Sequence, residues 1–163
     1  EGEPPLVLHG LNDVVVGQSG VAQLLDIDAV VDGAALGSYR ADAVIVSTAT
    51  GSTGYALSAG GPIMCPEARQ VLVQPVAAHT GLRSSLILPE ESVIELRVGD
   101  GCQAMLSVDG FQDAHLNPDD KVSISRSPYV AQFLRANPPS SFYTSLARRL
   151  GQTHRWRPPE AQA

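Results

Sequence analysis

The sequence DAVIVSTATGSTGYALSAGGP occupies residues 42–62 and contains an apolar run followed by small polar residues and glycine. Residues 43–47 are apolar or small and rich in β-branched side chains, which favours a strand. Every residue from Thr50 to Gly54 is a hydroxyl residue or glycine, and a short helix can begin at Ser52 or Thr53. Such a loop is expected to leave unpaired backbone N–H groups at the start of the helix, with hydroxyls beside them, which suits a nucleotide. An ordinary strand-to-helix connection with Ser52 as its cap explains the same residues equally well.

The apolar runs outside this stretch are also short, β-branched and bounded by Gly, Asp or Pro, which is typical of strands. Including residues 43–47, the predicted strands are Leu6–Leu8, Leu11–Val16, Val21–Ile27, Val30–Val31, Ala34–Arg40, Ala43–Ser47, Val71–Pro75, Ser85–Leu88, Val93–Val98, Ala104–Val108 and Lys121–Arg126. This number of short strands predicts a mainly β domain built as a sandwich or a curled sheet.

Three turn signals separate these runs. Asp32-Gly33 lies between apolar residues and predicts a β-hairpin. Gly99-Asp100-Gly101 predicts a second hairpin, between the runs that begin at residues 93 and 104. Residues 117–120 read NPDD and predict a third turn.

The clearest helix signal lies near the end of the sequence. Ser140 or Ser141 can cap a helix whose single apolar stripe consists of Phe142, Leu146 and Leu150. A helix with one apolar stripe needs a surface on which to pack that stripe. We therefore expect this helix to dock on another part of the protein or on a second copy.

The domain organisation follows from these runs. Residues 1–5 are acidic and Pro-rich and resemble a linker remnant, and residues 6–151 are expected to form one β domain. Residues 152–163 are polar and Pro-rich and are expected to form a flexible tail.

Composition excludes several classes of partner. The 163 residues carry 11 basic and 17 acidic side chains, and Lys121 is the single lysine, so no positive field attracts nucleic acid or anionic membranes. No apolar run approaches the roughly 18 residues of a spanning helix. Cys65 and Cys102 are too few for a disulfide framework, and no spacing of His and Cys predicts a metal site. These features predict a cytoplasmic protein.

The order of short motifs resembles the NAD kinase family over roughly residues 10–150. Thr48–Tyr55 followed by Ser58–Pro62 is similar to the family's Thr-Pro-Thr-Gly-Ser-Thr-Ala-Tyr and Ser-x-Gly-Gly-Pro signature. Asn12-Asp13 resembles its Asn-Glu/Asp motif, and Ser107–Gly110 and the start of a helix at Phe142-Tyr143 resemble later segments. Ala49 and Gly54 depart from the signature, where the family has Pro and Ala.

The resemblance implies a β-sandwich of the NAD kinase C-terminal domain type, with a short helix after the Thr-Gly-Ser-Thr loop and a C-terminal helix. It also implies that the α/β catalytic domain, with its Gly-Gly-Asp-Gly loop, precedes these residues. Family members transfer the terminal phosphoryl group of ATP, or of polyphosphate, to the 2′-hydroxyl of the adenosine ribose of NAD, using Mg²⁺ or another divalent cation. The implied partners are NAD or NADP, ATP or polyphosphate, the protein's own N-terminal domain and further copies in a homo-oligomer. Alone, this chain would be the inactive dinucleotide-binding part.

The resemblance assigns NAD binding to Asn12, Asp13, Arg40, Asp42, Thr50, Thr53, Gly54, Tyr55 and Ser58. Asn12 and Thr53 would contact the adenine, and Asp13 would accept hydrogen bonds from ribose hydroxyls. Tyr55 and Ser58 would complete the adenine pocket, and Asp42 would face the nicotinamide end, often across a subunit contact. His79 and Asp109 are further candidates. No catalytic residue, protein-built metal site or bound cofactor is expected in this chain alone.

Purely structural interpretations of the same residues remain open. Without the resemblance, Asn12-Asp13 is a turn at the end of a strand, Arg40 and Asp42 form a surface ion pair, and Asp109-Gly110 is a turn. Two alternative functions also remain: the related domain of a diacylglycerol or sphingosine kinase, and a non-catalytic β-sandwich that assembles with itself or senses a dinucleotide.

Overall fold

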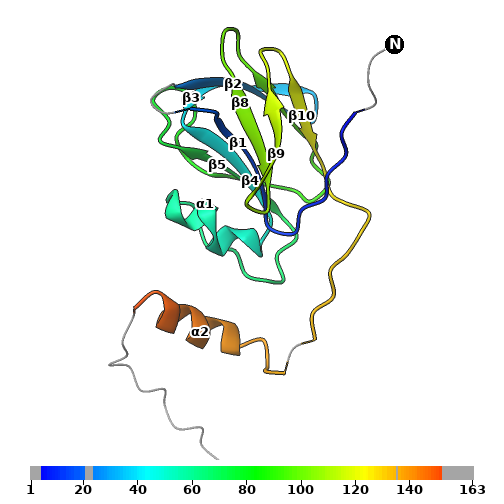
Figure 1. The fold of residues 1–163 in the computed structure, drawn as a ribbon. Coiled ribbons are helices and arrows are strands. Elements are labelled where there is room, and N and C mark those ends of the chain that lie inside the picture. The colour runs from blue at the N-terminus through cyan, green and yellow to red at the C-terminus, as the bar shows by residue number, and fades with distance from the viewer. Residues whose placement is uncertain (1–4, 21–23, 135, 152–163) are drawn as a thin grey trace, which may run out of the picture. The chain divides into compact units, whose positions relative to one another are not determined.

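Antiparallel strands form two sheets in the computed structural model, which describes residues 5–20, 24–134 and 136–151 (Figure 1). The six-stranded sheet has the order β6-β5-β4-β1-β8-β9 and comprises β1 (Asp13–Gln18), β4 (Ala43–Ser47), β5 (Val71–Val76), β6 (Leu86–Leu88), β8 (Ala104–Val108) and β9 (Phe111–Leu116). The four-stranded sheet has the order β10-β7-β2-β3 and comprises β2 (Leu25–Val31), β3 (Ala34–Ala41), β7 (Ile94–Val98) and β10 (Lys121–Ile124). The predicted sandwich is confirmed.

The main core lies between the two sheets. Alternate residues of each strand point inward, as the burial pattern of Ile94–Val98 shows, with buried and exposed residues in strict alternation. The six-stranded sheet contributes Val16, Val44, Val46, Val73, Ala104, Leu106, Val108 and Leu116, and the four-stranded sheet contributes Leu25, Ile27, Ala29, Tyr39, Ala41, Ile94, Leu96 and Val98. Each fully buried aliphatic side chain contributes about 1.5–3 kcal/mol.

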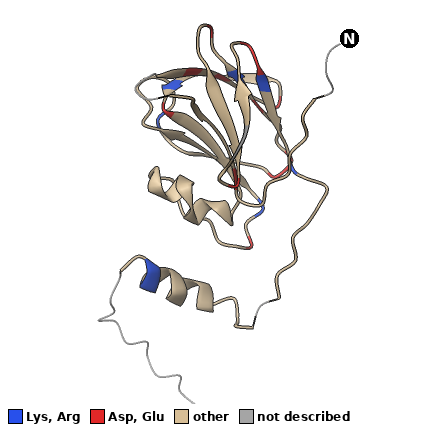
Figure 2. Ribbon diagram, viewed as in Figure 1, with Lys and Arg blue, Asp and Glu red and all other residues tan. Residues whose placement is uncertain are grey.

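A second, smaller core covers the other face of the six-stranded sheet. It consists of Ile45, Ala49, Ala56, Met64 and Leu72. The 3₁₀ turn η1 (Gly51–Thr53) and the one-turn helix α1 (Tyr55–Ser58) supply part of this cover. β4 is therefore buried along all five of its residues. The covering helix α1 carries no charged residue (Figure 2).

The outer face of the four-stranded sheet is polar. Arg97 lies directly opposite Asp28 across β7 and β2, and its guanidinium also pairs with Asp119 at 2.9 Å. Hydrogen bonds from Ser38 and Arg97 lower the pKa of Asp28. This pattern of one buried and one charged face is ordinary for an antiparallel sheet.

Several local predictions were wrong. The run Leu6–Leu8 is exposed coil rather than a strand. The predicted runs 21–27 and 30–31 meet in one strand, β2, although residues 21–23 lie outside the described residues. Gly99-Asp100-Gly101 is not a hairpin, because β7 belongs to the four-stranded sheet and β8 to the six-stranded one. β9 was not among the predicted strands; it pairs with β8 through a tight turn at Asp109-Gly110.

Residues 130–163 cluster as a separate unit, of which residues 130–134 and 136–151 are described. This unit contains the predicted C-terminal helix, α2 (Ser141–Arg149), with Ser140 at the cap position and no buried residue. Gly151 follows with φ of +69°, the conformation that commonly ends helices. The predicted tail 152–163 lies outside the described residues, and no helix in the described ranges is long and apolar enough to cross a membrane.

Candidate functional site

Two chain segments that are far apart in sequence meet at one end of the six-stranded sheet. β1 and β4 are antiparallel neighbours, and their register places Asp13 opposite Ser47. Beyond this pair, the backbone N–H of Thr48 donates to the carbonyl oxygen of Asn12 at 2.9 Å, and Thr48 Oγ1 donates to that of Leu11 at 2.8 Å. The Asn-Asp motif and the small-residue loop are thus joined directly by their backbones.

Gly51 is the residue that allows this close approach. A Cβ built on Gly51 would lie 2.2 Å from the carbonyl oxygen of Asn12 and 2.6 Å from Ser47 Oγ. Real Cβ atoms do not tolerate such distances to backbone atoms, so the position requires glycine for space rather than for an unusual φ.

The loop uses much of its own hydrogen-bonding capacity. The N–H groups of Gly51 and Ser52 donate to Oγ1 and to the carbonyl oxygen of Thr48, and the N–H of Gly54 donates to the carbonyl of Gly51. The expectation of unpaired N–H groups is therefore wrong for these three. Ser52 is not a cap either, because its buried hydroxyl donates to Ala49 and accepts from the N–H of Met64.

Exposed side chains of this segment form the surface that a ligand can reach. Thr50, Thr53, Tyr55 and Ser58 are exposed, and Tyr55 retains 46% of its accessible surface. Beside them Asn12 and Asp13 are half-buried. The structure therefore brings together Asn12 and Asp13 with the Thr50–Ser58 segment.

Asp109 acts as a clamp on the Asn-Asp motif. Its carboxylate accepts hydrogen bonds from three consecutive N–H groups, those of Leu11 at 2.7 Å, Asn12 at 2.6 Å and Asp13 at 3.1 Å. Its own N–H donates to the carbonyl of Asp13, and its φ is +52°, a conformation that Asp tolerates better than most residues. This geometry shows a structural function for a residue that the sequence suggested as a ligand contact.

The pKa values of the two carboxyl groups in this cluster, Asp13 and Asp109, are shifted in opposite directions. Burial and the neighbouring Asp109 charge raise the pKa of Asp13. For Asp109, burial acts upward, but the three backbone N–H groups outweigh it and lower its pKa. Asp109 therefore stays ionised and holds the motif, while Asp13 is the more easily protonated acid.

Removing the Asp109 charge tests this coupling. In an Asp109→Asn variant we expect the pKa of Asp13 to fall but to stay above its ordinary value, because burial is the larger cause of its shift. The stability contribution of Asp109 is fully present above its unfolded pKa near 3.8 and is lost as pH falls through the lower folded pKa. Carboxyl ¹³C NMR titration measures the first effect and acid unfolding the second. An unchanged pKa of Asp13 would contradict the coupling.

Asp42 and His79 lie at the other end of the six-stranded sheet, next to Arg40 near the end of β3 in the four-stranded sheet. Asp42 precedes β4 and Thr48 follows it, a separation of about 20 Å at 3.3 Å per residue. Arg40 pairs with Asp26 at 3.9 Å rather than with Asp42, whose carboxylate accepts from Gln18 Nε2. The N–H of His79 donates to the carbonyl of Arg40. The structure thus divides the predicted site residues into two groups.

Sequence reasoning missed the residues that hold this site together. Ser47 and Thr48 bind the Asn-Asp segment, and the buried Gln74 donates from Nε2 to the carbonyl of Ala59 just after α1. The sequence indicates these roles only weakly, because hydroxyl and amide side chains in or next to strands are common. Their partners are identified only by the strand pairing.

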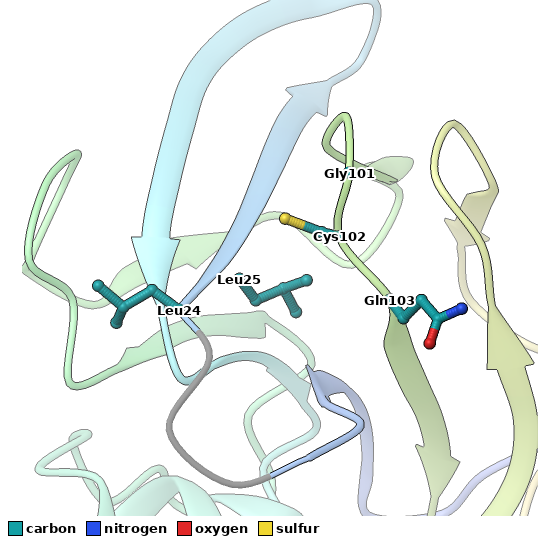
Figure 3. A pocket seen from close by; sticks show the side chains of 5 residues that line it. All are labelled: Leu24, Leu25, Gly101, Cys102 and Gln103. Atoms are coloured by element: carbon teal, nitrogen blue, oxygen red, sulfur yellow. The ribbon is translucent and has the colours of Figure 1, made fainter.

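A cavity of about 220 Å³ lies away from this site. It is lined by Leu24, Leu25, Gly101, Cys102 and Gln103 (Figure 3). It lies near the start of β8, whereas Asp109 follows the end of that strand. Within the described ranges, no three His, Cys, Asp or Glu side chains are grouped so that they could hold a metal ion.

Comparison with known proteins gives a consistent result. The family model of the ATP-NAD kinase C-terminal domain matches residues 11–136. The NAD kinase of Chloroflexus aggregans is 41% identical over 140 residues, which are 86% of this chain and 51% of that protein. The NAD kinase of Dehalococcoides mccartyi strain BAV1 is 36% identical over 140 residues, or 86% and 49%. The chain thus spans about half the length of the curated relatives it matches.

Solved structures agree with these relatives. Yeast NADH kinase complexed with NADH aligns with a TM-score of 0.81 and 28% identity, covering 95% of this chain and 46% of that one. An NAD kinase from Archaeoglobus fulgidus in complex with ATP aligns with a TM-score of 0.74 and 28% identity, covering 85% and 54%. These similarities do not favour the lipid-kinase alternative.

Proposed function

The chain belongs to the family of ATP-NAD kinase C-terminal domains, and from this premise we propose that the whole protein phosphorylates the 2′-hydroxyl of the adenosine ribose of NAD to give NADP. ATP, as its complex with a divalent cation, is the proposed donor, and a solved relative is complexed with ATP. This chain supplies the dinucleotide-binding part and is expected to be inactive alone.

The observation that carries this proposal is the junction of the Asn-Asp motif with the Thr50–Ser58 segment. Asn12 offers an amide that can both donate to and accept from an adenine edge, and Asp13 offers a carboxylate acceptor for ribose hydroxyls. Tyr55 is exposed on the Thr50–Ser58 segment, and its ring can contact a base. A carboxylate, an amide, hydroxyls and one aromatic ring can together contact the base and the ribose of an adenosine.

We assign Arg40 and Asp42 to the nicotinamide end of a dinucleotide. Because about 20 Å separates Asp42 from Thr48, we expect this group to contact the dinucleotide held by a second copy in a homo-oligomer. Gel filtration of the whole protein with light scattering measures the assembly. Cytoplasmic location and polyphosphate as a donor stay predictions from the sequence.

An activity assay of the whole protein tests the proposed function directly. Incubated with NAD, ATP and Mg²⁺, it is expected to produce NADP, which a dehydrogenase specific for NADP detects. A folded whole protein that forms no NADP would refute the proposal. Replacing NAD with diacylglycerol or sphingosine in the same assay tests the lipid alternative.

Replacing Asp13 tests its assigned role. Asp13→Asn removes a charged acceptor, so KM for NAD is expected to rise about 10-fold or more. The fold should not be weakened by the loss of a partly desolvated carboxylate whose pKa is raised. Glu95→Gln is the matched control, because it removes one exposed carboxylate from β7 on the other sheet. An unchanged KM in Asp13→Asn would exclude Asp13 from the site.

A further inference from the structure

Three charged side chains from distant parts of the sequence form an ion-paired cluster, which we name the Glu90 cluster. The carboxylate of Glu90 lies between two guanidinium groups. Its Oε1 is 3.5 Å from Arg69 Nη1, and its Oε2 is 2.9 Å from Arg126 Nη1. Arg69 precedes β5, Glu90 lies between β6 and β7, and Arg126 follows β10. The cluster therefore joins segments from both sheets.

The Glu90 cluster keeps positive charge and hydrogen-bond donors on its surface. The Glu90 side chain is 18% exposed, whereas the side chains of Arg69 and Arg126 are 74% and 55% exposed. Two positive charges and one negative charge leave a net charge of +1. Each guanidinium carries five N–H donors in a planar fork, and exposed ion pairs contribute little to stability. The carboxylate thus holds two arginines in place while most of their surface faces solvent.

The strand registers place this cluster at the end of the sandwich that carries the candidate site. Asp13 and Leu72 lie in one row on β1 and β5, with β4 between them, so they are about 10 Å apart at about 4.8 Å per strand. Arg69 precedes Leu72 by three residues. On the next strand, β6, Leu88 pairs with the residue before Leu72, and Glu90 follows two residues later. The Glu90 cluster therefore lies at the Asp13 end of the six-stranded sheet.

The other basic side chains described in residues 5–20 and 24–129 lie toward the opposite end. Arg40 is near the end of β3, where the chain enters β4, and Arg83 lies between the end of β5 and the start of β6. Arg97 and Lys121 are opposite each other on β7 and β10, next to the end of β7 that leads to β8. In a chain whose formal net charge is −6, the Glu90 cluster therefore supplies positive charge where the candidate site lies.

The proposed reaction brings two phosphate-bearing substrates to this end of the sheet. The Asn-Asp motif and the Thr50–Ser58 segment, to which the dinucleotide is assigned, contain no Lys or Arg. We propose that Arg69 and Arg126 bind the phosphate chain of the phosphoryl donor and that Glu90 positions them. Guanidinium groups pair with phosphate oxygens through charge-assisted and often bidentate hydrogen bonds. Such a site recognises the phosphate chain and not the base, so it accepts ATP or inorganic polyphosphate. The identity of the donor rests on the proposed function.

Calorimetric titration of the whole protein with tripolyphosphate, in the absence of NAD, tests the phosphate contact separately from the reaction. Arg69→Gln and Arg126→Gln are each expected to raise the Kd for tripolyphosphate about 5-fold. Lys121→Gln is the matched control, because it removes one exposed positive charge toward the opposite end of the sandwich, and its Kd should equal that of the unchanged protein. Arginine variants that bind tripolyphosphate as tightly as the control would overturn the proposal.

A Glu90→Gln variant separates phosphate binding from a purely structural role of the arginines. It breaks both ion pairs but keeps both positive charges. We expect this variant to bind tripolyphosphate at least as tightly as the unchanged protein, because the competing carboxylate is gone. If the arginines acted only by joining loops through Glu90, this variant would lose tripolyphosphate binding as the arginine variants do. That result would overturn the proposal.

Steady-state kinetics of the whole protein identify the substrate that the cluster contacts. In the double variant Arg69→Gln/Arg126→Gln, KM for ATP is expected to rise about 10-fold or more while KM for NAD stays unchanged. With polyphosphate as the donor, the same rise would show that the phosphate chain alone is recognised. A rise in KM for NAD alone would assign the arginines to the dinucleotide and overturn the proposal. A whole protein that binds tripolyphosphate through these arginines but forms no NADP would refute the proposed reaction and not the phosphate site.

Discussion

A Gly51→Ala variant is expected to lose about 3 kcal/mol of unfolding free energy. The added methyl group would meet the carbonyl oxygen of Asn12 at 2.2 Å and its carbonyl carbon at 2.5 Å. These are backbone atoms at the junction of two strands, so they cannot rotate away as a flexible side chain would. The junction must separate, and the hydrogen bond from Thr48 N–H to Asn12 is expected to break with it.

Chemical denaturation followed by circular dichroism measures this loss. Gly20→Ala is the control, because a Cβ there meets no atom within 4 Å and its φ is not positive. That variant is expected to change the unfolding free energy by less than about 0.5 kcal/mol. If both glycine variants were equally stable, the close contact at Gly51 would not exist in solution.

An Asp109→Ala variant is expected to lose about 2 kcal/mol of unfolding free energy and to weaken NAD binding about 10-fold or more. The variant removes the acceptor of three backbone N–H groups, those of residues 11–13. These three N–H groups would then bond to water or remain without an acceptor, which is less favourable. The side chains of Asn12 and Asp13 would also lose their fixed orientation. Asp109→Asn should recover part of both losses, because its amide oxygen remains an acceptor.

Asp32 provides a control that is closely matched to Asp109. It also precedes a glycine in a hairpin turn, has φ of +50°, and accepts from the N–H of Val93 and the hydroxyl of Ser92. Asp32→Ala is expected to cost about 2 kcal/mol as well, yet to leave KM for NAD in the whole protein unchanged. If Asp109→Ala also left KM unchanged, the clamp would support the fold alone.

Strands could be predicted from the sequence where the apolar pattern within the strand itself indicated burial. Residues 43–47 (AVIVS) and 104–108 (AMLSV) are apolar apart from one serine each, and both are strands. Phe111–Leu116 was missed because Gln, Asp and His interrupt its apolar pattern, although pairing with β8 makes it a strand. Leu6–Leu8 has the composition of a strand but no partner strand, and composition alone does not supply backbone hydrogen bonds.

Contacts between sheets could not be predicted from local spacing. Gly99-Asp100-Gly101 has the composition of a hairpin turn, and whether the chain turns back or crosses to the other sheet depends on where the flanking apolar faces are buried. For the same reason Arg40 and Asp42, two residues apart, have different partners, Asp26 and Gln18. The motif Asn12-Asp13 could be predicted as a site component, but its clamp by Asp109 required knowledge of the β8–β9 turn.

The burial of β4 on both faces has a consequence for ligand recognition. A strand whose five residues are all buried, with neighbours on both sides, opens only when the domain unfolds. Two residues separate the Thr50–Ser58 segment from the end of this strand, and the N–H groups of Gly51 and Ser52 are bonded to Thr48, so we expect the backbone of the segment to be ordered before any ligand binds. Association then requires little loss of protein conformational entropy, and affinity can come from a few polar contacts. If this segment binds the adenine as proposed, we expect it to select bases by shape, because an ordered backbone rearranges little around a larger base.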